Sequence, residues 1–228
     1  MKKIGKMNEL AWVLGIVLCA LGVSLCTKAN FGLSMIAAPA YILHVKISQF
    51  LPWYSQGVSE YVWQFFWLIL TCLIVRRFKF RYLLSFGTGI LFGLALDGWL
   101  FLFGGGATYE SLVIRILAFA IGLPITAFAI ALFFRTSLPL EIYELTVAEV
   151  SNRYNLPVNR VKFVYDAMML AISVTLACFL MHGFVGIGIG TVLSTLLNAT
   201  LIAAFGKLLD RFFTFEPRFP KLIEKLGQ

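Results

Sequence analysis

Six long runs of apolar residues alternate with short polar segments along the chain. They cover about residues 10–27, 58–75, 82–103, 112–134, 163–181 and 184–205. Each run is close to the ~17–25 residues that a helix needs to cross a ~30 Å hydrocarbon core. The alternating pattern of membrane-spanning strands is absent, and only helices or closed barrels satisfy their backbone in lipid. The pattern therefore predicts six transmembrane helices in a single membrane domain, residues 1–228.

Two shorter segments fit neither a span nor a simple loop. Residues 34–43 are apolar, but as a helix they would reach only ~15 Å, and Pro39 lies within them. We expect a half-helix or re-entrant segment here, with Ser34 as its N-cap. Residues 141–152 alternate acidic and apolar positions. This second segment fits an interfacial amphipathic helix or a second half-helix, and both alternatives stay open.

The two halves of the chain resemble each other in sequence. An offset of 107 residues places Lys28 on Arg135, and an offset of 101 places Asp97 on Asn198. Each half holds three spans, so the second half enters the membrane from the opposite side. The predicted fold is an all-α polytopic membrane protein. It has six transmembrane helices in two inverted three-helix repeats, residues 8–104 and 112–206, with a short half-helix or interfacial helix after the first helix of each repeat.

Composition excludes a soluble domain. The chain is 60% hydrophobic and 13% charged, whereas a soluble domain is about 45–50% apolar and about 25% charged. The four cysteines lie within apolar runs without a CxxC spacing, and the two histidines are far apart. The sequence carries no HExxH, P-loop or nucleophile elbow. We therefore expect no enzyme, no cofactor and no metal site.

The basic residues indicate the orientation. Of the nineteen Lys and Arg residues, all except Lys28, Lys46 and Arg115 fall on one side of the six-span scheme. The positive-inside rule makes that side cytoplasmic. It also explains the net charge of +8 better than nucleic-acid binding does. The expected location is the bacterial inner membrane, with both termini and a basic tail, residues 207–228, in the cytoplasm.

Polar residues inside or beside the spans are the candidates for solute binding. Lys28 and Arg135 end the first helix of each repeat, where they could snorkel to the interfaces or attract an anion. Asp97 lies within the third span, as an ion or solute ligand or as a partner of Lys28. The predicted solute-binding residues are Lys28, Asn30, Ser34, Asp97, Arg135, Glu141, Glu144 and Asn198.

Three charge contacts are predicted among these and neighbouring residues. We expect Lys28 and Asp97 to approach within ion-pair or one-water distance, because stranding either charge in the membrane is costly. We expect Arg135 to pair with Glu141, Glu144 or an anionic ligand. Lys162 and Asp166, four residues apart, should form an ion pair along one helix.

Several segments resemble a family of bacterial membrane proteins. Gly22 with residues 28–34 (KANFGLS) resembles the joint after the first helix of the YczE/YyaS/YitT-like integral membrane proteins. Residues 154–162 and the glycine-rich run 183–191 resemble the same family, and the chain departs from it at Met35, where proline is common. The resemblance covers roughly residues 10–206. It implies a multi-span protein of the bacterial inner membrane and names no substrate.

The expected function is a secondary transporter or exporter of a small solute, with an anion among the candidates. Inverted repeats are common in such proteins, and their solute sites lie at the repeat interface. The alternatives are a substrate-binding membrane subunit of a multi-component importer and a non-transporting accessory protein. The expected partners are the lipid bilayer and a small solute, and a homodimer is a possible assembly.

Overall fold

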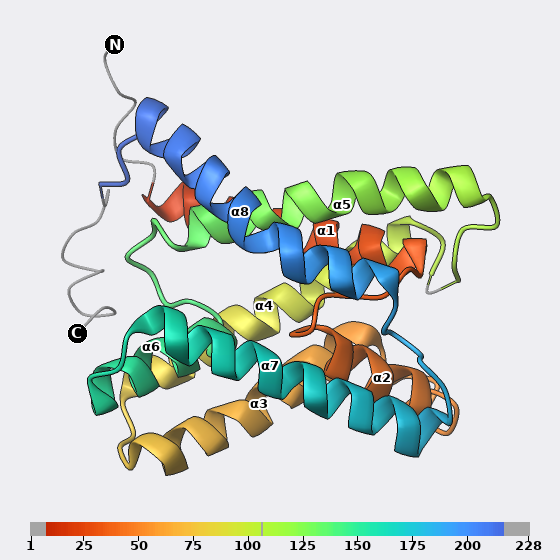
Figure 1. Cartoon of the computed structure of the whole chain (residues 1–228), viewed down its shortest axis with the longest axis horizontal. Helices are drawn as coiled ribbons and strands as arrows, with labels where there is room; N and C mark the ends of the chain where they lie inside the picture. Colours follow the sequence, from red (N-terminus) through yellow and green to blue (C-terminus); the bar gives the residue numbers. More distant parts are fainter. Residues whose placement is uncertain (1–7, 106, 217–228) are drawn as a thin grey trace.

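The chain forms a bundle of helices. The structure is a computed structural model that describes residues 8–105 and 107–216 (Figure 1). Six of the described helices are long and apolar enough to cross a membrane. They are α1 (Asn8–Ala29), α3 (Gln56–Val75), α4 (Phe80–Leu102), α5 (Leu112–Phe133), α7 (Val158–Leu176) with its π-helical extension η1 (Ala177–Met181), and α8 (Ile189–Phe212). The short helices are α2 (Ala38–Ile47) and α6 (Ile142–Tyr154). The predicted all-helical, six-span class is confirmed.

Polar residues set several helix ends. The side chain of Ser55 accepts a hydrogen bond from the backbone N–H of Val58 and so caps the start of α3. Asn30 after α1 and Asn155 after α6 have positive φ angles of 52°. Asparagine enters this left-handed region more readily than most residues, and the helix cannot continue through it. These residues explain why the apolar runs end where they do.

Two sequence expectations about helix boundaries are wrong. Ser34 does not cap α2: the N-cap is Ala37, whose side chain makes no capping bond, and the Ser34 carbonyl accepts from the N–H groups of Ala37 and Ala38. The sixth span begins at Ile189 rather than 184, because Gly186 takes a positive φ of 74° in the preceding loop. It continues to residue 212, so the expected tail starts inside α8, and residues 217–228 lie outside the described part.

Helices α1 and α5 cross in antiparallel directions at the centre of one side of the bundle (Figure 1). A Cβ added to Gly22 would lie 2.7 Å from the carbonyl oxygen of Gly122, and the reverse distance is 2.8 Å. Small residues allow this close approach of backbones. Helix α4 packs on α1, and α8 packs on α5. Together α1, α4 and α5 enclose one apolar core.

Helix α6 begins beside the middle of α3 and follows it toward its end. The backbone N–H of Ile142 points at the side chain of Gln64, in the middle of α3, at 3.4 Å. The hydroxyl of Tyr154, at the other end of α6, donates to the carbonyl of Ile74 at 2.9 Å. Residues of α3, α6 and α7 form the second apolar core. Glu141, just before α6, therefore lies deep inside the bundle.

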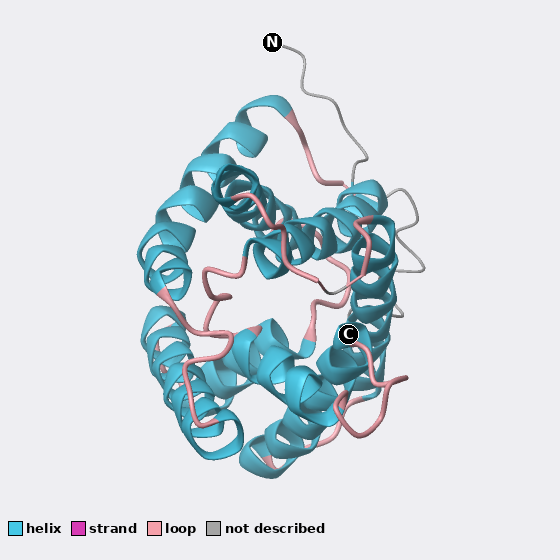
Figure 2. Cartoon of the chain, turned by 90° about the vertical axis from the view of Figure 1, so that its right-hand side faces the viewer, coloured by secondary structure: helices cyan, strands magenta, loops and turns pink. Residues whose placement is uncertain are grey.

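Helix α2 has the corresponding arrangement at the other end of the bundle: like α6, it begins inside the bundle and runs outward. The chain before it reaches α7, where Ser173 donates to the carbonyl of Met35 at 3.4 Å. The helix then runs outward, and near its end His44 contacts the carbonyl of Tyr54, just before α3. Figure 1 shows α2 and α6 at opposite ends of the bundle. Figure 2 views it from the end that holds α2, with the long helices around the rim.

Candidate functional site

A group of buried polar side chains lies where α6 meets the middle of α3. The exposed fractions are 1% for Glu60, 0% for Gln64, 7% for Glu141 and 3% for Tyr143. Glu60 and Gln64 are one helical turn apart on α3, so they face the same neighbour. That neighbour is the start of α6, which carries Glu141 and Tyr143. We call these four residues the carboxyl cluster.

Hydrogen bonds join the carboxyl cluster across the two helices. The Gln64 amide bridges to the start of α6, because Nε2 donates to Oε2 of Glu141 at 3.3 Å while Oε1 faces the backbone N–H of Ile142. The hydroxyl of Tyr143 donates to Oε2 of Glu60 at 3.0 Å. Each carboxyl therefore has one oxygen that accepts a hydrogen bond from the opposite helix.

The second oxygen of each carboxyl has no hydrogen-bond partner among the described residues. Oε1 of Glu60 and Oε1 of Glu141 are both buried and unpaired there. Burial disfavours a charged carboxylate, and it raises the pKa of Glu141 well above its usual range. The negative charges of Glu144 and Glu60 raise this pKa further, while the hydrogen bond from Gln64 opposes the shift. The arrangement favours the neutral acid.

A third acidic residue, Glu144, lies between this cluster and α7. Burial raises the pKa of Glu144, and the positive charge of Lys162 on α7 opposes that shift. Lys162 itself pairs with Asp166 at 3.0 Å, so the predicted ion pair along this helix is confirmed. Glu144 thus lies between the buried cluster and a charged pair near the start of α7.

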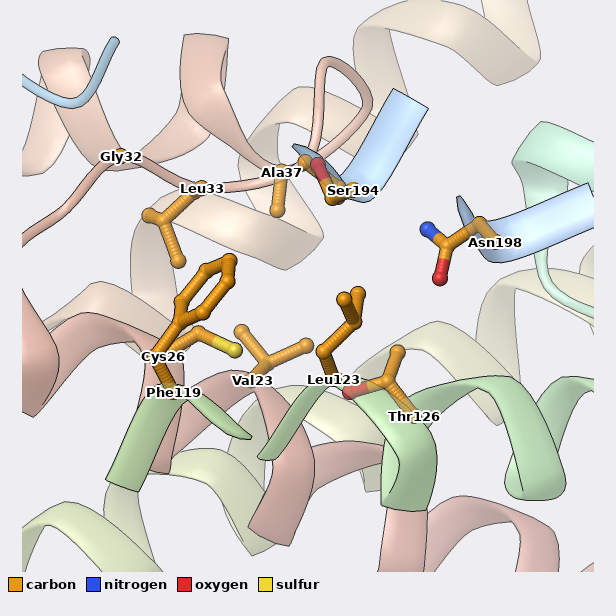
Figure 3. A pocket seen from close by; sticks show the side chains of 11 residues that line it. Val23, Cys26, Gly32, Leu33, Ala37, Phe119, Leu123, Thr126, Ser194 and Asn198 are labelled. Carbon is orange, nitrogen blue, oxygen red and sulfur yellow. The ribbon is translucent and has the colours of Figure 1, made fainter. Parts of the chain in front are cut away.

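A small pocket lies on the other side of the bundle, between α1, α5, α8 and the joint before α2 (Figure 3). Its volume is about 20 Å³, which is room for about one water molecule. The polar residues that line it are Ser34, Thr126, Ser194 and Asn198. Oδ1 of Asn198 is buried without a partner. The pocket therefore brings together two of the predicted site residues, Ser34 and Asn198.

Among the described residues Lys28 and Asp97 do not form the direct ion pair that was expected, and each has other partners. Nζ of Lys28 donates to the carbonyl of Gly105 at 2.9 Å and lies 5.0 Å from the ring centre of Tyr109. Asp97 instead accepts from the backbone N–H of Gly57 at 2.7 Å and from the hydroxyl of Ser55. Its charge is satisfied at the positive N-terminal end of α3, which makes an ammonium partner unnecessary.

Arg135 also has a different partner from the expected ones. Its guanidinium forms two hydrogen bonds of 2.6 Å with the carboxylate of Asp210 on α8. It therefore joins α5 to α8, and Glu141 and Glu144 lie elsewhere. Asn30 makes its contact through the backbone, because its carbonyl oxygen accepts a hydrogen bond from Arg115 at 3.0 Å. Lys28, Asn30, Asp97 and Arg135 thus belong to contacts near the helix ends, apart from the carboxyl cluster.

Glu60, Gln64 and Tyr143 are not among the residues that were predicted to form the site. Glu60 is an ionisable residue inside an apolar run, which is by itself a signal of a functional site. Its place three residues into the expected span also fits an interfacial residue, so position alone does not single it out. The contact with Glu141 depends on the depth at which α6 begins, and nothing in the sequence of either segment fixes that depth.

Comparisons with known proteins identify a family and name no function. A family of unknown function, DUF6198, matches residues 6–207. The Uncharacterized protein YyaS of Bacillus subtilis (strain 168) is 24% identical over 218 residues, which is 93% of this chain and 98% of the relative. No solved structure matches the chain. The predicted resemblance to YyaS-like proteins is confirmed, and the chain belongs to the family of unknown function DUF6198.

Proposed function

We propose that the chain is a secondary transporter that moves a small solute across the bacterial cytoplasmic membrane. The observation that carries the proposal is the pair of short helices, α2 and α6, which begin inside the bundle and run to opposite ends. Transporters commonly build their solute sites at the starts of such discontinuous helices, near the middle of the membrane. Here the start of α6 carries Glu141 and meets buried Glu60.

Contacts between the halves support two inverted repeats. Asn8 accepts from the backbone N–H of Ser137 at 2.7 Å, and Arg115 donates to the carbonyl of Asn30. Residues 8 and 115, and residues 30 and 137, are each related by the offset of 107. Two pairs of helices follow the same exchange, since α1–α4 corresponds to α5–α8 and α3–α6 to α7–α2. An exchange of this kind is expected of a pseudo-two-fold axis. The contact between α3 and α4 does not follow this exchange, because α7 and α8 do not touch in the described part of the chain.

The proposed orientation places both termini in the cytoplasm. Support comes from the basic residues where α3 ends and α4 begins: Arg76, Arg77, Lys79 and Arg81. Reporter fusions after residues 79 and 215 should be cytoplasmic, and a fusion after residue 106 should be external. A cytoplasmic reporter at 106 would contradict the inverted arrangement, because the halves would then share one orientation.

The charges favour an uncharged or cationic solute over the anion first considered. The deeply buried ionisable groups of the cluster are carboxyls, whereas Lys28 and Arg135 already have protein partners near the helix ends. An anion at the cluster would meet like charge or displace a hydrogen-bonded side chain. No catalytic role and no cofactor form part of this proposal.

Flux measurements on the purified protein in liposomes test the function directly. Vesicles loaded with a mixture of small metabolites should lose particular components faster than protein-free vesicles, as measured by mass spectrometry. Tight binding of a metabolite without flux would contradict the proposal and favour the binding subunit of an importer. The absence of both would favour an accessory protein.

A further inference from the structure

The carboxyl cluster combines features that need a ligand to complete them. Glu60 and Glu141 are each more than nine-tenths buried. One oxygen of each carboxyl accepts a hydrogen bond, and Oε1 of each has no partner within residues 8–105 and 107–216. A buried unpaired polar atom costs about 1–3 kcal/mol, and more when the group is charged. Something must therefore satisfy these oxygens or neutralise their charge.

The surroundings supply little positive charge to do so. The titratable groups closest to the pair on α6 are Tyr143 and Glu144. Farther out, Lys162, Tyr165 and Asp166 lie on α7, which packs on α6, and Cys19 lies on α1. On other sides of α3, Asp97 of α4 binds the N–H of Gly57, and His44 of α2 contacts the carbonyl of Tyr54. Lys162 forms an ion pair with Asp166. Most of these neighbours are neutral or acidic. Neutral groups do not balance a negative charge and acidic groups repel it, so the surroundings disfavour the state in which both carboxyls are ionised.

We propose that Glu60 and Glu141 together bind an exchangeable proton, which makes them the proton site of the transporter. The proposal rests on the proposed function and adds its energy coupling. A protonated carboxyl carries no charge, so it needs no cation beside it. Its O–H group can donate a hydrogen bond to an oxygen that lacks a partner. A metal ion fits less well, because sodium or calcium would need several more oxygen ligands, and the described residues hold no group of three or more His, Cys, Asp or Glu side chains that could bind a metal.

Proton exchange at this place would act on the contact between the halves. Glu60 lies on α3 of the first half, and Glu141 begins α6 of the second. Loss of the proton leaves two buried negative charges on opposite sides of one interface, and like charges repel. Opening that interface to water relieves the repulsion. The site therefore links protonation to the relative position of the halves.

Infrared spectroscopy of the purified full-length protein tests the proton without a known solute. The C=O stretch of a protonated carboxyl should be present at neutral pH and lost at alkaline pH. The variant E60Q/E141Q should lose that component, while the control E149Q should keep it, because Glu149 pairs with Lys79 at 2.9 Å and is not part of the carboxyl cluster. A double variant whose spectrum in this region matches the wild type would overturn the proposal.

If the double variant does not fold, spectra of the wild-type protein test the proposal by themselves. Absence of the protonated band at neutral pH would overturn the proton site. Loss of the band on addition of sodium or potassium chloride at constant pH would overturn it in favour of a cation site. Persistence of the band in either salt supports the proton. Because no solute is present, these results do not depend on whether the liposomes show flux.

Discussion

Two of the interfaces between the halves of the chain are held in different ways. Between α1 and α5 the backbones approach at Gly22 and Gly122, and the neighbouring residues are mostly small and apolar. Between α3 and α6 the contact runs through side-chain hydrogen bonds around buried carboxyls. The first interface depends on shape, whereas the second depends on protonation and hydrogen bonding.

The difference separates a fixed contact from an adjustable one. Close packing of the two backbones at Gly22 and Gly122 leaves no room for a group to enter at that point. In the second interface, the same atoms gain or lose stability as a proton is bound or released. A transporter that moves its halves needs both properties, and this chain places them on different pairs of helices.

The largest expected effect is on the pH dependence of stability. The raised pKa of Glu141 means that the folded state holds its proton more tightly than the unfolded state, where the pKa is about 4.3. This stability is fully present below the unfolded pKa and is lost as pH rises through the folded pKa, by up to ~1.4 kcal/mol per pH unit. Unfolding in detergent at a series of pH values should show this slope. The slope should be smaller in Glu141→Gln and unchanged in Glu149→Gln.

The glycine contact gives the next largest effect. Gly22→Val should destabilise the protein by about 1–3 kcal/mol or more, because the added Cβ would meet backbone atoms of α5. Gly87→Ala on α4 is the matched control, since its Cβ would meet nothing within 4 Å. Thermal unfolding of both variants provides the comparison. Equal midpoints would mean that α1 and α5 are not in close contact.

A smaller effect is expected from a hydroxyl pair in the polar interface. Thr71 of α3 and Thr146 of α6 have their hydroxyl oxygens 2.7 Å apart. Hydrogen bonds between membrane helices contribute about 0.6 kcal/mol on average. Thr71→Val, Thr146→Val and the double variant form a cycle whose coupling energy should be of that size. Strictly additive losses would show that the hydroxyls do not support each other.

The smallest effect is expected at the corresponding hydroxyl of the apolar interface. Thr126 of α5 donates to the carbonyl of Gly122 in its own helix at 2.9 Å, and the bond does not cross to α1. Thr126→Val should therefore change the unfolding free energy by less than about 0.5 kcal/mol. A loss larger than that of Thr71→Val would reverse the assignment of polar and apolar interfaces.

The sequence predicted spans better than contacts, for a physical reason. Apolar length depends on local composition, so the six spans could be placed to within a few residues except where Gly186 delays the start of α8. The partners of Lys28, Asp97 and Arg135 depend on which helix ends meet. The amino-acid composition of a helix end does not tell which other helix end lies beside it. Asp97, for example, has its charge satisfied by backbone N–H and hydroxyl donors that no charge pattern reveals.

The packing of α8 has a consequence for the surrounding bilayer. In the described structure α8 packs on α5 and does not contact α7, and its residues Val192, Leu196 and Leu197 are exposed. In a membrane, acyl chains must cover these side chains and complete the wall of the protein beside Ser194 and Asn198. The free energy of tilting α8 therefore depends on the length and fluidity of the surrounding lipids. The same chain should behave differently in bilayers of different thickness.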